Sequence, residues 1–300
     1  MQDRLIQSPL NYTGGKYKLL SQILPFFPKN INLMLDLFCG GANVGLNVNS
    51  KKLILNDKEK ELIRLFKYFK KHQSDKIFKD LENLIDEFNL SKSSKMGYEF
   101  YNCNSTKGLA SYNKENFLKL RNSYNKDKNI LKLFLLIVFG FNNQLRFNSK
   151  NEFNLPCGKR DFNLKMQEKL RLFIEALQNK EVYLQNKDFR KFDINILDKK
   201  SFVYIDPPYF LARASYNENG AWSKNDELDL LDLLKKLDDR GVKVALSNVI
   251  FHKNKEHKIL IQWLKNNTQF KIEFLNFSYK NCNYQAKNSY TQEILLRNYK

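Results

Sequence analysis

Apolar runs that stop abruptly at glycine or proline are the feature that most constrains how this chain folds. Leu33–Phe38 ends at a Cys-Gly-Gly turn, and Ser201–Asp206 ends at two consecutive prolines. Residues at helical spacing follow such runs, as between Glu61 and Lys71 after the short run Leu53–Asn56. This alternation predicts an α/β fold with a doubly wound, mostly parallel sheet and helices on both faces.

The expected elements continue in this way to the end of the chain. Strands are predicted near 33–38, 53–56, 182–184, 201–206, 242–247, 272–277 and 293–297, and helices near 44–48, 61–71, 170–177, 228–237 and 259–264. The last two strands are expected to pair antiparallel. Residues 73–160 break the alternation with two apolar helical stretches and a polar hairpin whose turn is Ser149–Glu152. We therefore predict a main domain of 1–72 and 161–300 and an inserted, mainly helical subdomain of 73–160.

Composition indicates a folded protein with an anionic partner. The chain has 300 residues, of which 42% are hydrophobic, and this is enough to bury a core and excludes intrinsic disorder. Lysine and arginine number 51 against 32 acidic residues, for a formal net charge of +19. A polyanion such as nucleic acid is the expected partner. An AT-rich coding bias that inflates Lys and Asn is the alternative explanation.

Several classes of protein are not indicated. The N-terminus has no apolar signal region, and the longest apolar run, Leu133–Phe139, is too short to span a bilayer. We expect a soluble, unexported protein with no membrane partner. No Cys-x-x-Cys pair exists, and no histidine lies near a second metal ligand, so no metal site is expected. We predict four buried thiols and three surface histidines: Cys39, Cys103, Cys157 and Cys282, and His72, His252 and His257.

The tetrapeptide Asp206-Pro-Pro-Tyr209 carries the clearest chemical signal. It follows an apolar strand directly, at the edge where open α/β sheets bind ligands. Pro207 and Pro208 keep the backbone extended and remove two N–H donors, so the carbonyls and the Asp206 carboxylate remain as acceptors. Such a cluster can accept hydrogens from an exocyclic amine while the Tyr209 ring stacks on a planar base. The alternative is an ordinary strand end with a Pro-Pro stop.

A nucleoside-binding half is predicted at the ends of the first strands. Gly40 and Gly41 allow close backbone approach after Phe38, and Asp57 closes the second strand, where an acid can bind a ribose diol. Because no Gly-x-Gly-x-x-Gly motif is present, a nucleoside fits better than a dinucleotide. Asp188-Phe189 offers an acceptor and an apolar face for adenine, or alternatively a helix cap with a core Phe.

Taken together, these segments resemble the Dam-type, or D12 class, DNA adenine N6-methyltransferases, which are found alone or in type II restriction-modification systems. The motifs occur in the family's order: Asn11–Lys16, Asp36–Gly41, Leu55–Asp57, the hairpin Phe141–Gly158, Asp206–Tyr209 and Ala245–Asn248. The resemblance implies a Rossmann-like fold and methyl transfer from S-adenosylmethionine to N6 of a flipped adenine in double-stranded DNA. It also implies that 1–72 and 161–300 bind the cofactor and that 73–160 recognises the target.

The resemblance assigns roles by position. Asp206, Pro207, Pro208 and Tyr209 would be catalytic. S-adenosylmethionine would be held by Tyr12, Lys16, Phe38, Gly40, Asp57, Asp188, Phe189 and Asp206. DNA would be contacted by Asn11, Asn142, Gln144, Arg146, Asn148 and Lys150, with Arg146 reading a guanine and Lys150 contacting phosphate. A structural ion pair is the alternative for Arg146.

The chain also departs from the family pattern at three positions. Ala42 stands where the family has a second spaced glycine, Asn11 where GATC-modifying members have a basic residue, and Gln144 where the family has an apolar one. The last two place the GATC target in doubt more than the reaction. The loops Phe210–Lys224, with Tyr216 and Trp222, and Ser278–Thr291 are expected to close over the base, to contact phosphates or simply to be solvated.

Two rival functions remain open from the sequence. An N4-cytosine or RNA adenine methyltransferase could use the same amine-binding motif, and a catalytically silent DNA-binding protein could keep the fold and the charge. The intact Asp206–Tyr209 motif and Asp57 favour an active DNA adenine enzyme. We expect it in the cytoplasm of a bacterial or phage-infected cell, with a restriction endonuclease as a possible functional partner.

Overall fold

The computed structural model describes residues 4–12, 14–213, 222–276 and 291–300, and the chain forms two compact units. A helical unit comprises residues 1–15, 40–47 and 59–184, and a sheet unit comprises residues 16–39, 48–58 and 185–300. The helical unit contains the predicted insertion together with segments on both sides of it. The narrower boundary at 73–160 remains a prediction.

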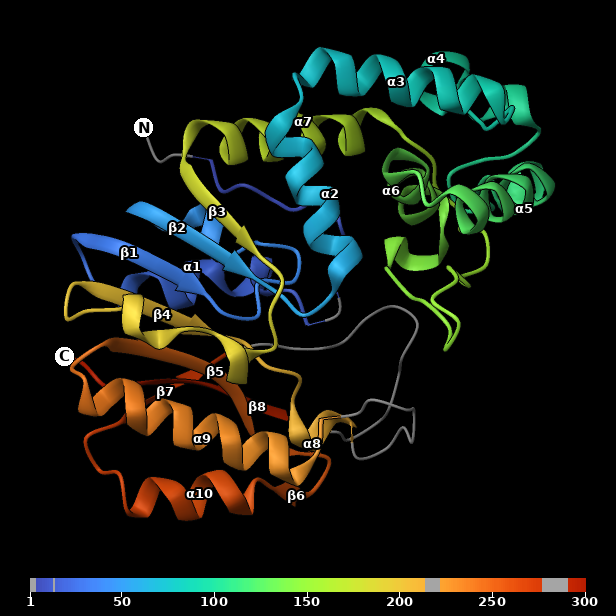
Figure 1. The fold of residues 1–300 in the computed structure, drawn as a ribbon. Coiled ribbons are helices and arrows are strands. Elements are labelled where there is room, and N and C mark those ends of the chain that lie inside the picture. The colour runs from blue at the N-terminus through green and yellow to red at the C-terminus, as the bar shows by residue number, and fades with distance from the viewer. Residues whose placement is uncertain (1–3, 13, 214–221, 277–290) are drawn as a thin grey trace. The chain divides into compact units, whose positions relative to one another are not determined.

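The sheet unit confirms the predicted, mostly parallel sheet (Figure 1). Its strands are β1 (Ile31–Asp36), β2 (Ser50–Asn56), β4 (Ser201–Ile205), β5 (Lys243–His252), β6 (Lys255–Glu256), β7 (Lys271–Leu275) and β8 (Thr291–Arg297). Six of them lie in the order β2-β1-β4-β5-β8-β7, and β6 pairs with β5. The pairs β1–β2, β1–β4 and β4–β5 are parallel, whereas β8 is antiparallel to both β5 and β7. The predicted antiparallel pairing of the last two strands is therefore correct.

Strand β4 lies at the centre of the sheet and is buried on both faces. Every residue of this strand is buried, as expected for a parallel strand covered on both sides. The ring of Phe27, which follows η1 (Lys16–Leu19), α1 (Leu20–Ile23) and η2 (Leu24–Phe26), packs on Phe202 and Tyr204. Helix α9 (Lys224–Asp239) packs on β5, and α10 (Lys258–Lys265) packs on α9 (Figure 1). These contacts hold β4, and its pairing with β1 places the carboxyl ends of the two strands, where predicted site residues follow, side by side.

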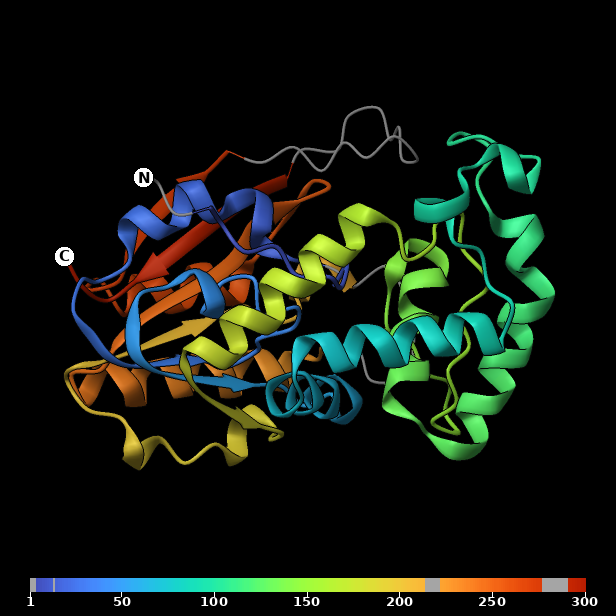
Figure 2. The ribbon, with the colours of Figure 1, turned by 90° about the horizontal axis from the view of Figure 1, so that it is seen from above.

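Packing around one apolar helix organises the helical unit (Figure 2). Its main elements are α2 (Lys60–Lys71), α3 (Ser74–Glu87), α4 (Ser93–Met96), η4 (Glu99–Tyr101), α5 (Ala110–Asp127), α6 (Ile130–Phe139), η5 (Phe141–Asn143), α7 (Leu164–Asn179) and β3 (Glu181–Gln185), whose last residue belongs to the sheet unit. Helix α6 is apolar on nearly all sides and is buried against α2, α3 and α5. Asn129 caps α6 by accepting hydrogen bonds from the backbone N–H groups of Leu131 and Lys132.

The predicted hairpin forms as a loose antiparallel pair without continuous strands. Isolated bridges join Gly140 to Cys157 and Phe147 to Phe153. The Asn148 backbone N–H donates to the Glu152 carbonyl at 2.9 Å, so the chain turns at the predicted 149–152 segment. The hairpin is therefore held by few backbone contacts, and its side chains provide much of its order.

Three expectations about local structure are wrong. No α-helix begins at 44–48, where only the 3-10 turn η3 (Gly45–Asn47) forms, because too few residues remain before β2 for an α-helix. His257 is 1% exposed, since its ring caps the start of α10. Cys39 is buried but Cys103 and Cys157 are only partly so, and Cys282 lies outside the described residues. No helix in the described ranges is both long and apolar enough to cross a bilayer.

Candidate active site

Three side chains of the sheet unit surround the buried ammonium group of Lys16. Lys16, at the start of η1, places its Nζ 2.9 Å from Oδ1 of Asp206 and 3.3 Å from Oε1 of Glu293. Asp206 follows β4 directly, and Glu293 reaches the same place from β8. The Tyr209 hydroxyl donates to Oε1 of Glu293 at 2.7 Å, and the Lys16 ammonium lies 4.8 Å from the centre of the Tyr209 ring. The Asp-Pro-Pro-Tyr motif is thus tied at both ends to one charge cluster.

Burial and charge together set the protonation of this cluster. The Lys16 and Glu293 side chains are 2% and 1% exposed, whereas Asp206 retains 19% exposure. Burial works to lower the pKa of Lys16, but the Asp206 and Glu293 carboxylates outweigh it and the pKa rises. Burial raises the pKa of Asp206 to about 6, against the opposing effect of Lys16. Asp206 is therefore the acceptor of the cluster that faces outward, and it ionises close to neutral pH.

Pro207 and Pro208 follow the end of β4, as the sequence predicts, and provide no backbone N–H donors there. Pro207 is buried and Pro208 is partly exposed, and no strand or helix includes either residue. Tyr209 is also partly exposed, while its hydroxyl is engaged by Glu293. The geometry therefore leaves carbonyl oxygens, one carboxylate and one aromatic ring beside the carboxyl end of β4.

A second group of residues in the sheet unit is aromatic. The rings of Phe38 and Phe189 lie 5.4 Å apart, and Trp222 lies 5.7 Å and 5.6 Å from them. Phe38 follows β1 and stays partly exposed, whereas Phe189 is 4% exposed. Asp188 caps the short helix η6 (Phe189–Lys191) and pairs with Arg190. The alternative of a cap followed by a core Phe describes these two residues, and binding of adenine by them remains a prediction.

Asp57 lies at the carboxyl end of β2, where the sequence places it. The Cys39 backbone N–H donates to the Asn56 carbonyl at 2.8 Å, and this bond brings Cys39, which follows β1, beside the end of β2. Burial raises the pKa of the Cys39 thiol, and the charge of the nearby Asp57 raises it further. A buried acid beside the turn that follows β1 is suited to binding a pair of hydroxyl groups.

The glycine turn itself lies in the helical unit and is approached by the N-terminal segment. Gly40 has φ of +45°, and a Cβ at this position would lie 2.8 Å from Cδ1 of Tyr12. A Cβ on Gly41 would lie 3.0 Å from the Ser8 hydroxyl. Ala42, at the departure from the family pattern, adopts φ of +57° in the left-handed region. Tyr12 and Gly40 are therefore close together, and binding of a cofactor by them remains a prediction.

We expect Gly40→Ala to lower the free energy of unfolding of this protein by about 2–4 kcal/mol, because left-handed backbone strain adds to overpacking against Tyr12. Urea denaturation would measure the change. Gly14→Ala is a matched control, since Gly14 has φ of +79° but open space where a Cβ would lie. Equal losses for the two variants would contradict the contact with Tyr12 as the cause.

The predicted DNA-contacting residues divide into two groups within the helical unit. Asn11 donates from its backbone to the Asn143 carbonyl at 3.2 Å and from Nδ2 to the Asn142 carbonyl at 2.8 Å. The structure therefore joins the N-terminal segment to the start of the hairpin. Gln144 lies partly exposed next to this junction.

At the tip of the hairpin, some predicted contacts also have structural roles. Oδ1 of Asn148 accepts from the backbone N–H groups of Lys150 and Glu152, each at 2.9 Å, and so forms the turn. Arg146 donates to Oδ1 of Asn154 at 2.9 Å and to its carbonyl at 3.2 Å. The structural partner of Arg146 is thus an amide, and among the described residues no ion pair of Arg146 is found. Lys150 is exposed at the turn.

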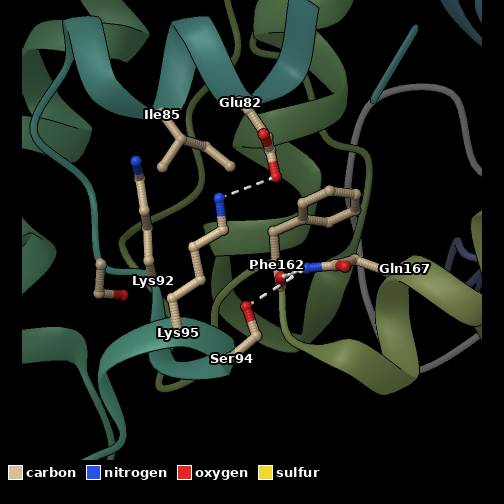
Figure 3. A pocket seen from close by; sticks show the side chains of 8 residues that line it. Glu82, Ile85, Lys92, Ser94, Lys95, Phe162 and Gln167 are labelled. Atoms are coloured by element: carbon tan, nitrogen blue, oxygen red, sulfur yellow. Dashed lines mark hydrogen bonds and ion pairs between the residues drawn. The ribbon is translucent and has the colours of Figure 1, made fainter. Parts of the chain in front are cut away.

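A small pocket in the helical unit is lined by none of the predicted site residues (Figure 3). Lys95 and Glu82 form an ion pair across it at 3.1 Å, and Gln167 donates to the Phe162 carbonyl at 2.8 Å. Asp161, which directly precedes Phe162 of the pocket lining, accepts a hydrogen bond from the Ser93 backbone N–H at 2.7 Å. These bonds join α3, α4 and the start of α7, so we assign the pocket to the fold.

Sequence reasoning missed several residues of the site. Glu293 is the most important, and its signal was an acidic residue inside the apolar run of β8. Trp222 was considered only as part of a loop, yet it completes the aromatic group. Glu227 was not considered at all, although it is fully buried next to Trp222. Tyr216 and residues 278–290 of the two loops lie outside the described residues.

Comparisons with known proteins identify the family of this chain. The family profile described as D12 class N6 adenine-specific DNA methyltransferase matches residues 12–289. The chain is 39% identical over 300 residues to the type II methyltransferase M.FokI of Planomicrobium okeanokoites, covering 98% of this chain and 43% of that protein. It is 38% identical over 302 residues to the modification methylase StsI of Streptococcus sanguinis, covering 99% and 43%. The DNA adenine methylase of Haemophilus influenzae is 30% identical over 247 residues, covering 80% and 78%.

The sheet order and the matching family profile define a Rossmann-like methyltransferase fold. More narrowly, the chain belongs to the D12 class of N6 adenine-specific DNA methyltransferases, as the sequence predicted. It spans less than half the length of M.FokI and of StsI.

Proposed function

We propose that this chain transfers a methyl group from S-adenosylmethionine to N6 of an adenine flipped out of double-stranded DNA at a specific site. The observation that carries the proposal is the Asp206 carboxylate, which follows β4 in an Asp-Pro-Pro-Tyr motif and is held by the buried Lys16. Membership of the D12 class supports the same reaction. An N4-cytosine or RNA reaction and a silent DNA-binding role are the outcomes that the experiment below must exclude.

The residues of the sheet unit fit a nucleoside-type cofactor. Asp57 would bind the ribose hydroxyls, and the partly exposed Phe38 with Phe189 would hold the adenine ring. Tyr12, Lys16, Gly40, Asp188 and Asp206 remain the other proposed contacts. When bound, S-adenosylmethionine supplies a methyl group that its sulfonium already makes electrophilic, so the protein contributes mainly position and electrostatics.

The catalytic work of the chain falls on its acceptors. Adenine N6 is a poor nucleophile because its lone pair is delocalised into the ring. Acceptance of its two hydrogens by the Asp206 carboxylate and the Pro207 carbonyl increases electron density on nitrogen. Asp206 can hold the proton that N6 loses, because burial raises the pKa of this carboxyl to about 6. Lys16 balances one of the two carboxylate charges and keeps Asp206 ionised near neutral pH.

Stacking helps to hold the extruded base. Tyr209 would contribute about 1–3 kcal/mol by stacking, against an unpairing cost of a few kcal/mol. The hydroxyl bond to Glu293 fixes the ring in place. Contacts to the DNA backbone from the basic chain, with its net charge of +19, would supply the remaining affinity.

Acid inactivation provides a test of the role of Asp206. Below pH ~6 we expect kcat/KM for methylation to fall about tenfold per pH unit, because the ionised Asp206 carboxylate is the form that accepts hydrogens. The Glu293 charge raises the pKa of Asp206. Glu293→Gln should therefore move this acidic limb of the pH–rate profile, the fall of kcat/KM in acid, to lower pH. Rate measurements between about pH 4.5 and about pH 8 at subsaturating DNA would follow the change, because this range brackets the pKa of Asp206 of about 6. A limb that stays in place or moves to higher pH would remove Asp206 from this role.

Hairpin variants should separate affinity from selectivity. We expect Lys150→Ala to weaken binding to all duplexes alike and to reduce the salt slope by about one unit. Arg146→Ala should relax discrimination at one base pair by about 1–3 kcal/mol, because a bidentate contact to guanine would be lost. Methylation rates on duplexes with single-pair changes would measure both effects. A uniform loss for Arg146→Ala would assign it to the hairpin bond with Asn154 instead.

The decisive experiment for the function is chemical mapping of the product. Purified protein would be incubated with duplex DNA and labelled S-adenosylmethionine, and the nucleosides would be identified after digestion. N6-methyladenine at one sequence supports the proposal. N4-methylcytosine, or methylation of RNA alone, would establish one of the rival reactions, and DNA binding without any product would establish the silent role.

We also propose the setting in which the enzyme works. M.FokI carries the name of a type II methyltransferase and StsI that of a modification methylase, so we propose functional pairing with a restriction endonuclease. The enzyme would act on DNA in the cytoplasm of a bacterial or phage-infected cell. Comparing cleavage of cellular DNA with and without expression of this chain would test the pairing.

A further inference from the structure

A carboxylate without solvent exposure lies behind the aromatic group of the sheet unit. Glu227, in the first turn of α9, is 0% exposed. Its Oε2 accepts from Nε1 of Trp222 at 2.6 Å, and its Oε1 accepts from Nδ2 of Asn248 at 3.3 Å. Nε2 of His257 lies 3.0 Å from the same Oε1. These partners come from the segment before α9, from β5 and from the start of α10.

The hydrogen bond at Nδ1 of His257 indicates which ring nitrogen carries a proton. Nδ1 of His257 accepts from the Leu260 backbone N–H at 3.2 Å as α10 begins. An imidazole with Nδ1 as acceptor carries a proton on Nε2, which lies 3.0 Å from Oε1 of Glu227 but without the geometry of a hydrogen bond. Burying a carboxylate in this way costs more than packing an apolar side chain of similar size. A role beyond stability explains why an acid occupies the position.

The partners of Glu227 extend to both halves of the proposed site. Trp222 packs on Phe38 and Phe189, the rings proposed to hold the cofactor adenine. The His257 ring lies 5.6 Å from that of Phe210, the residue directly after Tyr209. Asn248 ends the Ala245–Asn248 motif in β5, to which no role in the reaction is assigned above.

We propose that Glu227 is a positioning residue, which fixes the Trp222 ring against Phe38 and Phe189 and thereby shapes the adenine side of the cofactor site. The inference rests on the proposed function, because it takes the ligand to be an S-adenosyl compound. Trp222 is held at its N–H by Glu227, and its ring packs against Phe38 in an edge contact and against Phe189 in a tilted one. Loss of the carboxylate would free the Trp222 ring to tilt and disturb the surface that adenine contacts.

Tryptophan fluorescence and calorimetry with S-adenosylhomocysteine as the probe test this proposal. The chain has two tryptophans, and Trp263 packs on Phe270 at 4.9 Å, so Trp263→Phe leaves Trp222 as the only emitter. In that background the probe should change the Trp222 emission. Glu227→Gln should shift the emission of the free protein and weaken binding of the probe about tenfold, because a slightly misplaced ring makes poorer contacts. The kcat at saturating cofactor should change less than the affinity.

A double-mutant cycle and a matched control complete the experiment. Trp222→Phe keeps an aromatic ring but removes the N–H, so adding Glu227→Gln to it should weaken binding little further. Asp232→Asn, on the exposed side of the same helix, should leave affinity and emission unchanged. If Glu227→Gln does not fold, Trp222→Phe alone should still weaken binding several-fold.

The outcomes separate this inference from the proposed function. Unchanged affinity for the probe in both Glu227→Gln and Trp222→Phe would overturn the inference, even if thermal stability fell. A wild-type chain that does not bind S-adenosylhomocysteine would overturn the proposed function and this inference with it.

Discussion

Replacing Asp206 by alanine is expected to reduce methyl transfer to DNA by roughly 10³-fold or more, because the only outward-facing carboxylate of the charge cluster is lost. The backbone of the motif and the Pro207 carbonyl remain. Duplex affinity should persist, since phosphate contacts by basic residues supply most of it. A radiolabelled methyl assay at saturating DNA would measure the loss.

Two variants make the result specific. Asp206→Asn keeps the size of the side chain but replaces one acceptor oxygen by a donor, so it should be nearly as inactive as alanine. Asp193→Ala, which removes the cap of a short exposed helix in the same unit, should keep nearly full activity. Substantial turnover by both Asp206 variants would mean that another group accepts the hydrogens of the amine.

Replacing Lys16 by methionine is expected to lower the free energy of unfolding by about 3–5 kcal/mol near pH 8, since it leaves Asp206 and Glu293 without their shared cation. The folded-state pKa of Asp206 is already raised to about 6, and the loss of Lys16 should raise it further. A group whose pKa is raised on folding destabilises the fold when it ionises. The deficit should therefore be smallest in acid and should grow as pH rises through that pKa.

Urea denaturation at several pH values would follow the predicted change in stability. Lys18→Met is the matched control, because this lysine lies two residues away in η1 and is exposed. The surviving folded fraction of Lys16→Met should also methylate with an acidic limb shifted to higher pH. A deficit that stays constant with pH would mean that Lys16 contributes packing and no charge balance.

The sequence predicted the parts of the fold that depend on local pattern. The strands after which Asp57 and Asp206 lie were identified from apolar runs with sharp ends, and the sheet confirms them. The helix expected at 44–48 was wrong, because its apolar spacing continues for less than two turns before β2 begins. Spacing alone does not reveal how many residues remain before the next strand.

The site was predictable only where one motif held its residues together. Asp206 and Tyr209 are close in sequence, whereas Glu293 joins them through the pairing of β8 with β5. His257 was expected at the surface, since nothing in its neighbourhood indicates that the ring turns inward toward Glu227. Buried polar partners of this kind arise from contacts between distant segments, which a sequence pattern does not encode.

The position of β8 has a consequence for how an active molecule arises during protein synthesis. In the chain β7 precedes β8, but in the sheet β8 lies between β5 and β7. A growing chain that has already released the Asp-Pro-Pro-Tyr motif from the ribosome still lacks Glu293, the second carboxylate beside Lys16. Because N-terminal parts of a chain emerge first and distant strands pair slowly, the charge cluster is completed only after β8 has emerged and paired with β5. If the chain has the activity proposed for it, that activity should therefore arise only after translation has passed β8.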